Sequence, residues 1–191
     1  MTFDLIREIL GFSIGILYLW WEYHANPKVW IASVVMPAIS MWIYYSKGLY
    51  ADFAINIYYL IIAVYGYIHW TRKGTEKKST ETKITRITLR TALGCLAVGC
   101  GLWWLIWWLL GFTNSNVPVA DAFTTAFSIV GLWMMARKIA EQWIVWLIVD
   151  IVCTALYYYK GIYFYSALYL IYSVISVLGY RKWLNLIETE H

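Results

Sequence analysis

Hydrophobic positions along the chain are grouped into seven long runs, separated by short polar stretches or by stretches that contain glycine and proline. These runs are close to the roughly 20 apolar residues that an α-helix needs to cross a bilayer. A transmembrane β-barrel would instead show short segments of alternating hydrophobicity. The pattern therefore predicts an all-α integral membrane protein with seven transmembrane helices, at residues 6–24, 28–46, 49–70, 89–112, 120–137, 142–159 and 162–183.

The composition supports the membrane class. Of the 191 residues, 62% are hydrophobic, 19% are aromatic and only 14% are charged. A soluble domain has about 25% charged residues, so this composition excludes an ordinary soluble protein. The expected surroundings are membrane lipid, and no nucleic acid, cofactor or metal is expected as a partner.

An internal repeat divides the chain. A shift of 113 positions places Trp30 on Trp143, and the string Tyr-Tyr-x-Lys-Gly-x-Tyr begins at both Tyr44 and Tyr157. Because each unit has an odd number of helices, one linker helix between them gives both units the same orientation, as in parallel repeats about an axis along the membrane normal. The predicted fold is a SWEET-like 3+1+3 arrangement of two three-helix units, with the parts 1–72, 73–88 (a cytoplasmic loop), 89–112 (the linker helix) and 113–191.

Positive charges predict how the chain is oriented in the membrane. Twelve of the 15 Lys and Arg residues fall in the turns after the first, third and fifth segments and at the C-terminus. Cytoplasmic loops carry an excess of Lys and Arg. We therefore expect the N-terminus outside and the C-terminus in the cytoplasm.

A candidate binding site lies on the segment 142–159. In a helix, Trp143, Trp146 and Asp150 share one face, since residues three and four apart are neighbours. Asp150 falls near the middle of the apolar run, where an ionisable group is costly and is normally kept for function. Indole faces attract cations, so these side chains predict a site for a small aromatic cation. The alternative is that the tryptophans pack helices together and that Asp150 only caps or pairs locally.

Three further residues are candidates for the same site. Asn56 and Tyr59 form a polar stripe on the segment 49–70, and Tyr157 lies one further turn along the face of Asp150. Both Asn56 and Asp150 fall on a different residue type in the other copy of the repeat, as expected for a symmetric frame that binds an asymmetric molecule. Asn also joins helices inside membranes, and Tyr157 would equally suit the membrane interface, so these alternatives stay open.

Several strings in the chain resemble the PnuC family of vitamin transporters, whose fold is similar to that of the SWEET sugar transporters. They are the Trp-x-x-Trp-x-x-x-Asp motif ending at Asp150, Asp121-Ala122, Tyr65-Gly66-Tyr67 and the stretch 178–183. Family members that take up nicotinamide riboside usually have Asn at the end of that motif, whereas the thiamine-type branch, PnuT, tends to have Asp. The resemblance implies a transporter of the bacterial inner membrane that moves thiamine by facilitated diffusion, with trapping by cytoplasmic phosphorylation. A nicotinamide riboside transporter is the alternative.

The chemistry of the two vitamins bears on this choice. An ionised carboxylate only accepts hydrogen bonds, whereas Asn both donates and accepts. Thiamine offers an exocyclic amino donor and a positive thiazolium ring, while the carboxamide of nicotinamide riboside needs a donor and an acceptor together. We therefore expect Asp150 to pair with thiamine, and Trp143 or Trp146 to stack on one of its rings.

Two other function classes remain as rivals. A membrane enzyme would need both an acid and a base, and the lone Asp150 does not supply both; no enzymatic activity is expected. A non-transporting scaffold would not need polar stripes on two helices. Homo-oligomerisation through the glycine-rich segment 89–112 is compatible with the sequence.

Overall fold

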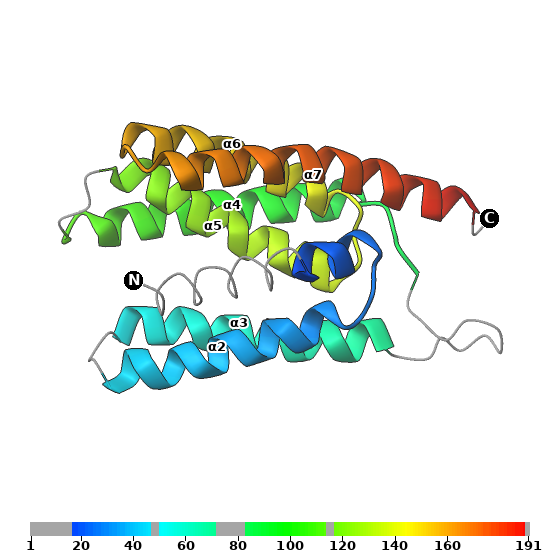
Figure 1. Cartoon of the computed structure of the whole chain (residues 1–191), viewed down its shortest axis with the longest axis horizontal. Helices are drawn as coiled ribbons and strands as arrows, with labels where there is room; N and C mark the ends of the chain where they lie inside the picture. Colours follow the sequence, from blue (N-terminus) through cyan, green and yellow to red (C-terminus); the bar gives the residue numbers. More distant parts are fainter. Residues whose placement is uncertain (1–16, 47–49, 72–82, 114–116, 190–191) are drawn as a thin grey trace. The chain divides into compact units, whose positions relative to one another are not determined.

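The computed structural model describes residues 17–46, 50–71, 83–113 and 117–189. A short helix at residues 17–23 precedes six labelled helices (Figure 1). Their bounds are α2 (Val29–Ser46), α3 (Tyr50–Thr71), α4 (Leu89–Leu110), α5 (Pro118–Ala136), α6 (Gln142–Tyr159) and α7 (Tyr163–Thr189). The chain divides into two compact units, Met1–Thr82 and Lys83–His191.

The helices follow the hydrophobic runs closely, and the all-helical prediction is confirmed for the described residues. Among these residues, α4, α5 and α6 are each long and apolar enough to cross a membrane. The largest departure is at the end of α7, which continues to Thr189 instead of ending near residue 183. Hydropathy marks where the apolar run ends, whereas a helix continues as long as the residues that follow tolerate helical geometry.

The helix α5 begins two residues before the predicted segment 120–137, with Pro118 in its first turn and Val117 at the N-cap position. Proline suits this position because its missing N–H would have no partner inside the helix. Asp121 therefore lies in the first turn, where its negative charge still faces the positive end of the helix dipole.

The core of the first unit is a pair of perpendicular indoles between α2 and α3. The rings of Trp30 and Trp70 lie edge to face, with centroids 5.5 Å apart and planes at 89°. Both side chains are fully buried. Gly66 makes room for this pair, because a Cβ atom there would lie 2.5 Å from the Trp30 ring.

The second unit repeats this core between α6 and α7. The rings of Trp143 and Trp183 lie 5.9 Å apart at 88°, and a Cβ atom on Gly179 would lie 2.7 Å from the Trp143 ring. These three residues are the 113-residue counterparts of the cluster in the first unit. The helices of this unit pack in chain order, α4 against α5, α5 against α6, and α6 against α7.

The turn before each of these helix pairs also repeats. Ala25 and Lys138 both have positive φ angles, 50° and 52°, and they are the described residues other than glycine with this conformation. The N–H of Ala25 donates to the Glu22 carbonyl at 2.9 Å, and the N–H of Lys138 donates to the Met135 carbonyl at 2.9 Å. Non-glycine residues rarely adopt positive φ, so a match at this spacing is what the internal repeat predicts. The arrangement of the two units in the membrane stays a prediction.

In the second unit, a short extended segment before α4 lies along the turn between α5 and α6. Thr85 forms a parallel β-bridge with Ile139. Its N–H donates to the Lys138 carbonyl at 2.9 Å, and its carbonyl accepts from the N–H of Ala140 at 2.9 Å. The first unit has Pro27 at the place of Ala140. Since proline has no N–H, that turn lacks the donor that the bridge needs.

Glu141 fixes the same segment with its carboxylate. One oxygen accepts from Arg86 Nε at 2.6 Å, and the other accepts from the backbone N–H of Ile87 at 2.7 Å. This hydrogen bond, followed by the negative charge of Glu141, raises the pKa of the Arg86 guanidinium above its ordinary value. Residues 83–88 of the expected cytoplasmic loop are therefore attached to the second unit, and residues 73–82 lie outside the described residues.

Candidate functional site

Four of the six predicted site residues lie on α6, which packs between α5 and α7 (Figure 1). Trp143 and Asp150 are buried, and Trp146 and Tyr157 are half-buried. The helical spacing places these residues along one side of α6, but their neighbours differ.

Asp150 is a buried carboxylate in the middle of an apolar helix. Only 6% of the residue is exposed, and its Oδ2 accepts a hydrogen bond from Ser176 Oγ on α7 at 3.2 Å. Within the described part of the chain, no Lys, Arg or His forms an ion pair with Asp150. A buried charge is costly unless it is paired and hydrogen-bonded. The described residues thus leave this carboxylate with one hydrogen bond and without a cation.

Trp143 belongs to the repeated core. Its ring is packed edge to face with Trp183 and covers the backbone of Gly179. The N–H groups of both Trp143 and its counterpart Trp30 are buried and have no hydrogen-bond partner among the described residues. Because the same features occur in both units, they do not by themselves mark a binding site. A contact between Trp143 and substrate stays a prediction.

Trp146 has no aromatic counterpart in the first unit. Its indole packs against α5 at Gly131, where a Cβ atom would lie 3.4 Å from the ring. Its buried N–H also has no hydrogen-bond partner in the described ranges. The first unit has Ser33 at the place of Trp146 and Tyr18 at the place of Gly131. Large and small side chains are exchanged at this helix contact, so the indole of Trp146 is special to the second unit.

Tyr157 lies in a group of aromatic rings at the far end of α6. It stacks on Tyr169 at 5.3 Å with planes at 8°, and on Tyr165 at 5.6 Å with planes at 30°. Tyr169 in turn packs edge to face on Tyr172 at 5.7 Å. The three partners are all on α7, so these rings tie the two helices together. A contact between Tyr157 and substrate remains a prediction.

Asn56 and Tyr59 lie on α3 in the first unit. Asn56 is buried, with 8% of the residue exposed. Tyr59 is half-buried, and its ring lies 5.9 Å from that of Tyr58. A buried amide is consistent both with a site residue and with a helix contact. Their predicted contact with substrate remains a prediction.

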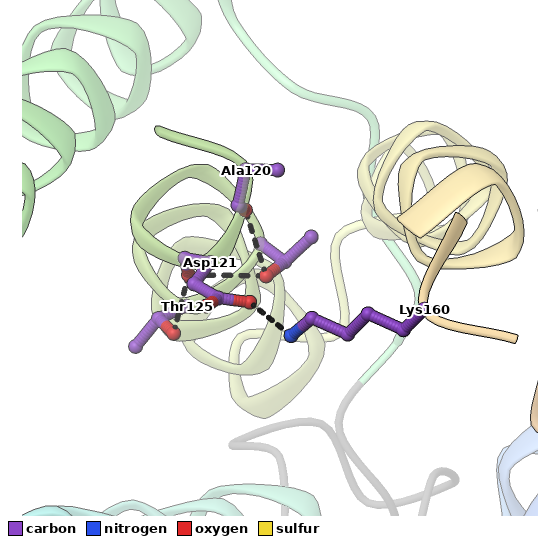
Figure 2. A network of polar contacts seen from close by, with 5 residues as sticks. Ala120, Asp121, Thr125 and Lys160 are labelled. Carbon is purple, nitrogen blue, oxygen red and sulfur yellow. Dashed lines mark hydrogen bonds and ion pairs between the residues drawn. The ribbon is translucent and has the colours of Figure 1, made fainter. Parts of the chain in front are cut away.

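An ion pair joins the start of α5 to the end of α6, three residues beyond Tyr157. Lys160 Nζ lies 3.3 Å from Asp121 Oδ1, and the side chains are 32% and 31% exposed. Figure 2 shows the pair together with Thr125, whose hydroxyl donates to the Asp121 carbonyl at 2.8 Å. Gly161 follows Lys160 with a φ of 71°, a conformation that glycine adopts readily. The pair therefore links the turn between α6 and α7 to the first turn of α5.

Ser176 is a buried hydrogen-bond partner of Asp150 that the sequence pattern did not indicate. It is buried on α7, and it donates to Asp150 across 26 residues of sequence. The repeat contains a signal that would have identified it, because Ser176 corresponds to Ala63 and Asp150 corresponds to Pro37. Both members of the pair thus replace apolar residues of the first unit.

A sequence comparison decides the family. The profile of the nicotinamide mononucleotide transporter family matches residues 5–185. The chain belongs to this family. The prediction of a PnuC-type membrane transporter is therefore confirmed.

Relatives of known function agree with the family. The chain is 27% identical to the nicotinamide riboside transporter PnuC of Escherichia coli, over 75% of this chain and 70% of that protein. It is 26% identical to PnuC of Neisseria mucosa, over 85% and 75%. It is also 28% identical to the riboflavin/roseoflavin transporter RibM of Streptomyces davaonensis, over 65% and 59%.

A solved structure supports the fold. The crystal structure of the vitamin B3 transporter PnuC matches 93% of this chain and 80% of its own, with a TM-score of 0.68 and 22% identity. The names of these proteins give nicotinamide riboside, riboflavin and vitamin B3, and thiamine is not among them. Membership of the thiamine-type branch stays a prediction.

One string in the chain fits a hydrolase pattern. Residues 11–15 read Gly-Phe-Ser-Ile-Gly, which matches Gly-x-Ser-x-Gly. This pattern indicates a hydrolase only where a strand turns into a helix. The string lies outside the described residues, and the match to the transporter family includes it, at residues 5–185.

Proposed function

We propose that this protein moves a flat, positively charged vitamin across the membrane by facilitated diffusion, and that nicotinamide riboside is its first candidate substrate. The observation that carries the proposal is the buried carboxylate of Asp150, which has one hydrogen bond and no cation among the described residues. The names of the PnuC relatives of Escherichia coli and Neisseria mucosa support the choice of nicotinamide riboside.

The electrostatics of Asp150 suit a cationic ligand. An ionisable residue inside a membrane is expensive and normally faces a cavity or a partner. A positive nicotinamide ring about 4 Å from the carboxylate would gain about 4 kcal/mol at an effective dielectric constant of about 20. The ligand would therefore supply the charge that the described residues do not.

Trp146 is the aromatic residue that we assign to the ligand. Its indole is half-buried on the same helix as Asp150, and its N–H has no hydrogen-bond partner in the part of the chain that the structure describes. A cation over an indole face gains about 0.5–2 kcal/mol, depending on desolvation. Its N–H could in addition donate to a hydroxyl or carbonyl oxygen of the ligand.

The transport route rests on the repeat. We propose that the helices before α4 and the helices after α4 form two parallel three-helix bundles joined by α4, with substrate bound between the bundles near the middle of the bilayer. Asn56 and Tyr59 would then line the site from the first unit. The positive charges favour the N-terminus outside and the C-terminus inside. Trapping by phosphorylation in the cytoplasm would make the uptake effectively one-way.

Thiamine is a second candidate, because position 150 carries Asp instead of Asn. A carboxylate accepts hydrogen bonds but does not donate them. The amino group of thiamine supplies a donor, and its thiazolium ring supplies the charge. The carboxamide of nicotinamide riboside would use its NH₂ group toward Asp150 and would need another donor for its carbonyl oxygen.

A calorimetric titration of the purified protein tests the proposal and separates the candidates. Nicotinamide riboside, thiamine and riboflavin are titrated into the wild type, Asp150→Ala and the control Asp121→Ala, whose carboxylate is partly exposed in the first turn of α5. We expect at least about tenfold weaker binding of the cationic vitamin to Asp150→Ala, with Asp121→Ala close to wild type. Absence of binding by all three vitamins, or an unchanged affinity in Asp150→Ala, would overturn the proposal.

A further inference from the structure

Beyond the carboxylate itself, we propose that Ser176 is a positioning residue for the ligand. Its hydroxyl holds Oδ2 of Asp150 and thereby directs Oδ1 toward the substrate. This inference rests on the proposed function, because it assigns Ser176 a role only through the contact between Asp150 and the vitamin.

The geometry of the pair is specific to two helices. Ser176 Oγ on α7 donates to Asp150 Oδ2 on α6 at 3.2 Å, and only 3% of Ser176 is exposed. A hydrogen bond at this position fixes the rotation of the carboxylate about its last side-chain bond. Oδ1 receives no hydrogen bond from the residues that the structure describes, so it is the oxygen left for a ligand.

Two neighbouring serines on α7 show what Ser176 does differently. Ser173 donates to the carbonyl of Tyr169, one turn earlier in its own helix, at 3.0 Å. Ser166 donates to the carbonyl of Thr154 at 2.9 Å. Serine in a helix commonly bonds to the carbonyl four residues before it. Ser176 instead donates to a side chain of another helix, and hydrogen bonds to charged groups are the stronger ones.

Comparison of the two repeats indicates that the fold does not require the pair of Ser176 and Asp150. At the equivalent places the first unit has Pro37 and Ala63, both buried. The matching turn and the matching indole pair form in that unit without a carboxylate or a hydroxyl at these positions. Since the local fold forms without the pair, we assign the pair to the binding of substrate.

Ser176 also holds the carboxylate of Asp150 in place when no ligand is bound. A hydroxyl that donates to Asp150 stabilises its charged form, and it keeps the carboxylate in one orientation between transport cycles. Ligand binding then needs less rearrangement of the site, which is the general advantage of a preorganised group. Removal of the hydroxyl should weaken binding through Asp150 alone.

The test is a double-mutant cycle read by calorimetric titration of nicotinamide riboside and of thiamine. Ser176→Ala and the control Ser173→Ala are each made in the wild type and in Asp150→Ala, which has no side-chain oxygen for Ser176 to hold. For the vitamin that the wild type binds, we expect Ser176→Ala to weaken binding about tenfold. Ser173→Ala should stay within about twofold of wild type, and Ser176→Ala should have no further effect in Asp150→Ala.

A second pair of variants keeps the test valid if alanine at this position disturbs folding. Thr and Val have similar shapes, but only Thr keeps the hydroxyl. Ser176→Thr should bind within about threefold of wild type, and Ser176→Val should bind like Ser176→Ala. Equal affinities for these two variants would overturn the inference, and so would a loss in Ser176→Ala that is unchanged in Asp150→Ala. If Asp150→Ala weakens binding but Ser176→Ala does not, only this inference fails. If the wild type binds no vitamin, the proposed function fails with it.

Discussion

Replacement of Gly179 by Ala should destabilise the second unit. The new Cβ atom would lie 2.7, 2.7 and 2.8 Å from three atoms of the Trp143 ring. Carbon atoms in favourable contact are about 3.5–4.0 Å apart, so the ring would have to move by about 1 Å. Trp143 is 1% exposed and packed edge to face on Trp183. It therefore has no free space into which it could move.

The size of the effect follows from this overlap. Added methyl groups in a well-packed core cost about 1–3 kcal/mol. For a chain of this length, each kcal/mol lowers the melting temperature by about 2–4 °C. Gly179→Ala should therefore melt about 2–12 °C below wild type. Gly66→Ala should behave alike, because its Cβ atom would lie 2.5 Å from the Trp30 ring.

Thermal unfolding of the purified protein in detergent measures this, with Gly94→Ala as the matched control. A Cβ atom on Gly94 would have nothing within 4 Å, and alanine is a better helix former than glycine by about 1 kcal/mol. Its melting temperature should be unchanged or slightly raised. If Gly179→Ala melted within about 1 °C of Gly94→Ala, the argument from the indole pair would be refuted.

Two further predictions concern polar contacts at the ends of the helices. Glu141→Ala leaves the N–H of Ile87 without its acceptor and should lower the free energy of unfolding by about 1–3 kcal/mol. Glu141→Gln keeps an acceptor and should lower it less. Equal melting temperatures for the two variants would contradict the role of that hydrogen bond. Lys160→Met removes the partly exposed ion pair with Asp121 and should cost at most about 1 kcal/mol. This loss should shrink in about 1 M salt, where charges are screened beyond about 3 Å; a loss that does not change with salt would refute the ionic explanation.

The helices were predictable because each hydrophobic run had to satisfy its backbone polar groups internally. α6 begins and ends where the apolar pattern does, at Gln142 and Tyr159. Helix ends outside the apolar runs were less predictable. The start of α5 depends on Pro118, whose fixed φ suits the first turn of a helix, and the end of α7 at Thr189 lies beyond the apolar run.

Contacts between distant parts of the chain were not predictable from composition. The segment before α4 looked like a hydrophilic loop, yet Thr85 pairs with Ile139, and Glu141 accepts from Ile87. Those bonds depend on a backbone N–H at Ala140 and on the turn around Lys138. Hydropathy reports on neither of these features. Local pattern therefore gave the helices, while three-dimensional packing decided what the polar residues between them do.

The repeat separates residues that maintain the fold from residues that serve the site. Both units need the same turn and the same indole pair, and they share Trp at the first motif position, as Trp30 and Trp143. A position at which the two units differ is not needed for the turn and the indole pair that they share. The positions that differ on the candidate face are Ser33 and Trp146, Pro37 and Asp150, Ala63 and Ser176, and Asn56 and Tyr169. Because one small vitamin has no two-fold symmetry, a symmetric frame must present different groups from its two halves. Substitutions that change selectivity are therefore expected at positions 146, 150 and 176, while those at position 143 should act first on stability.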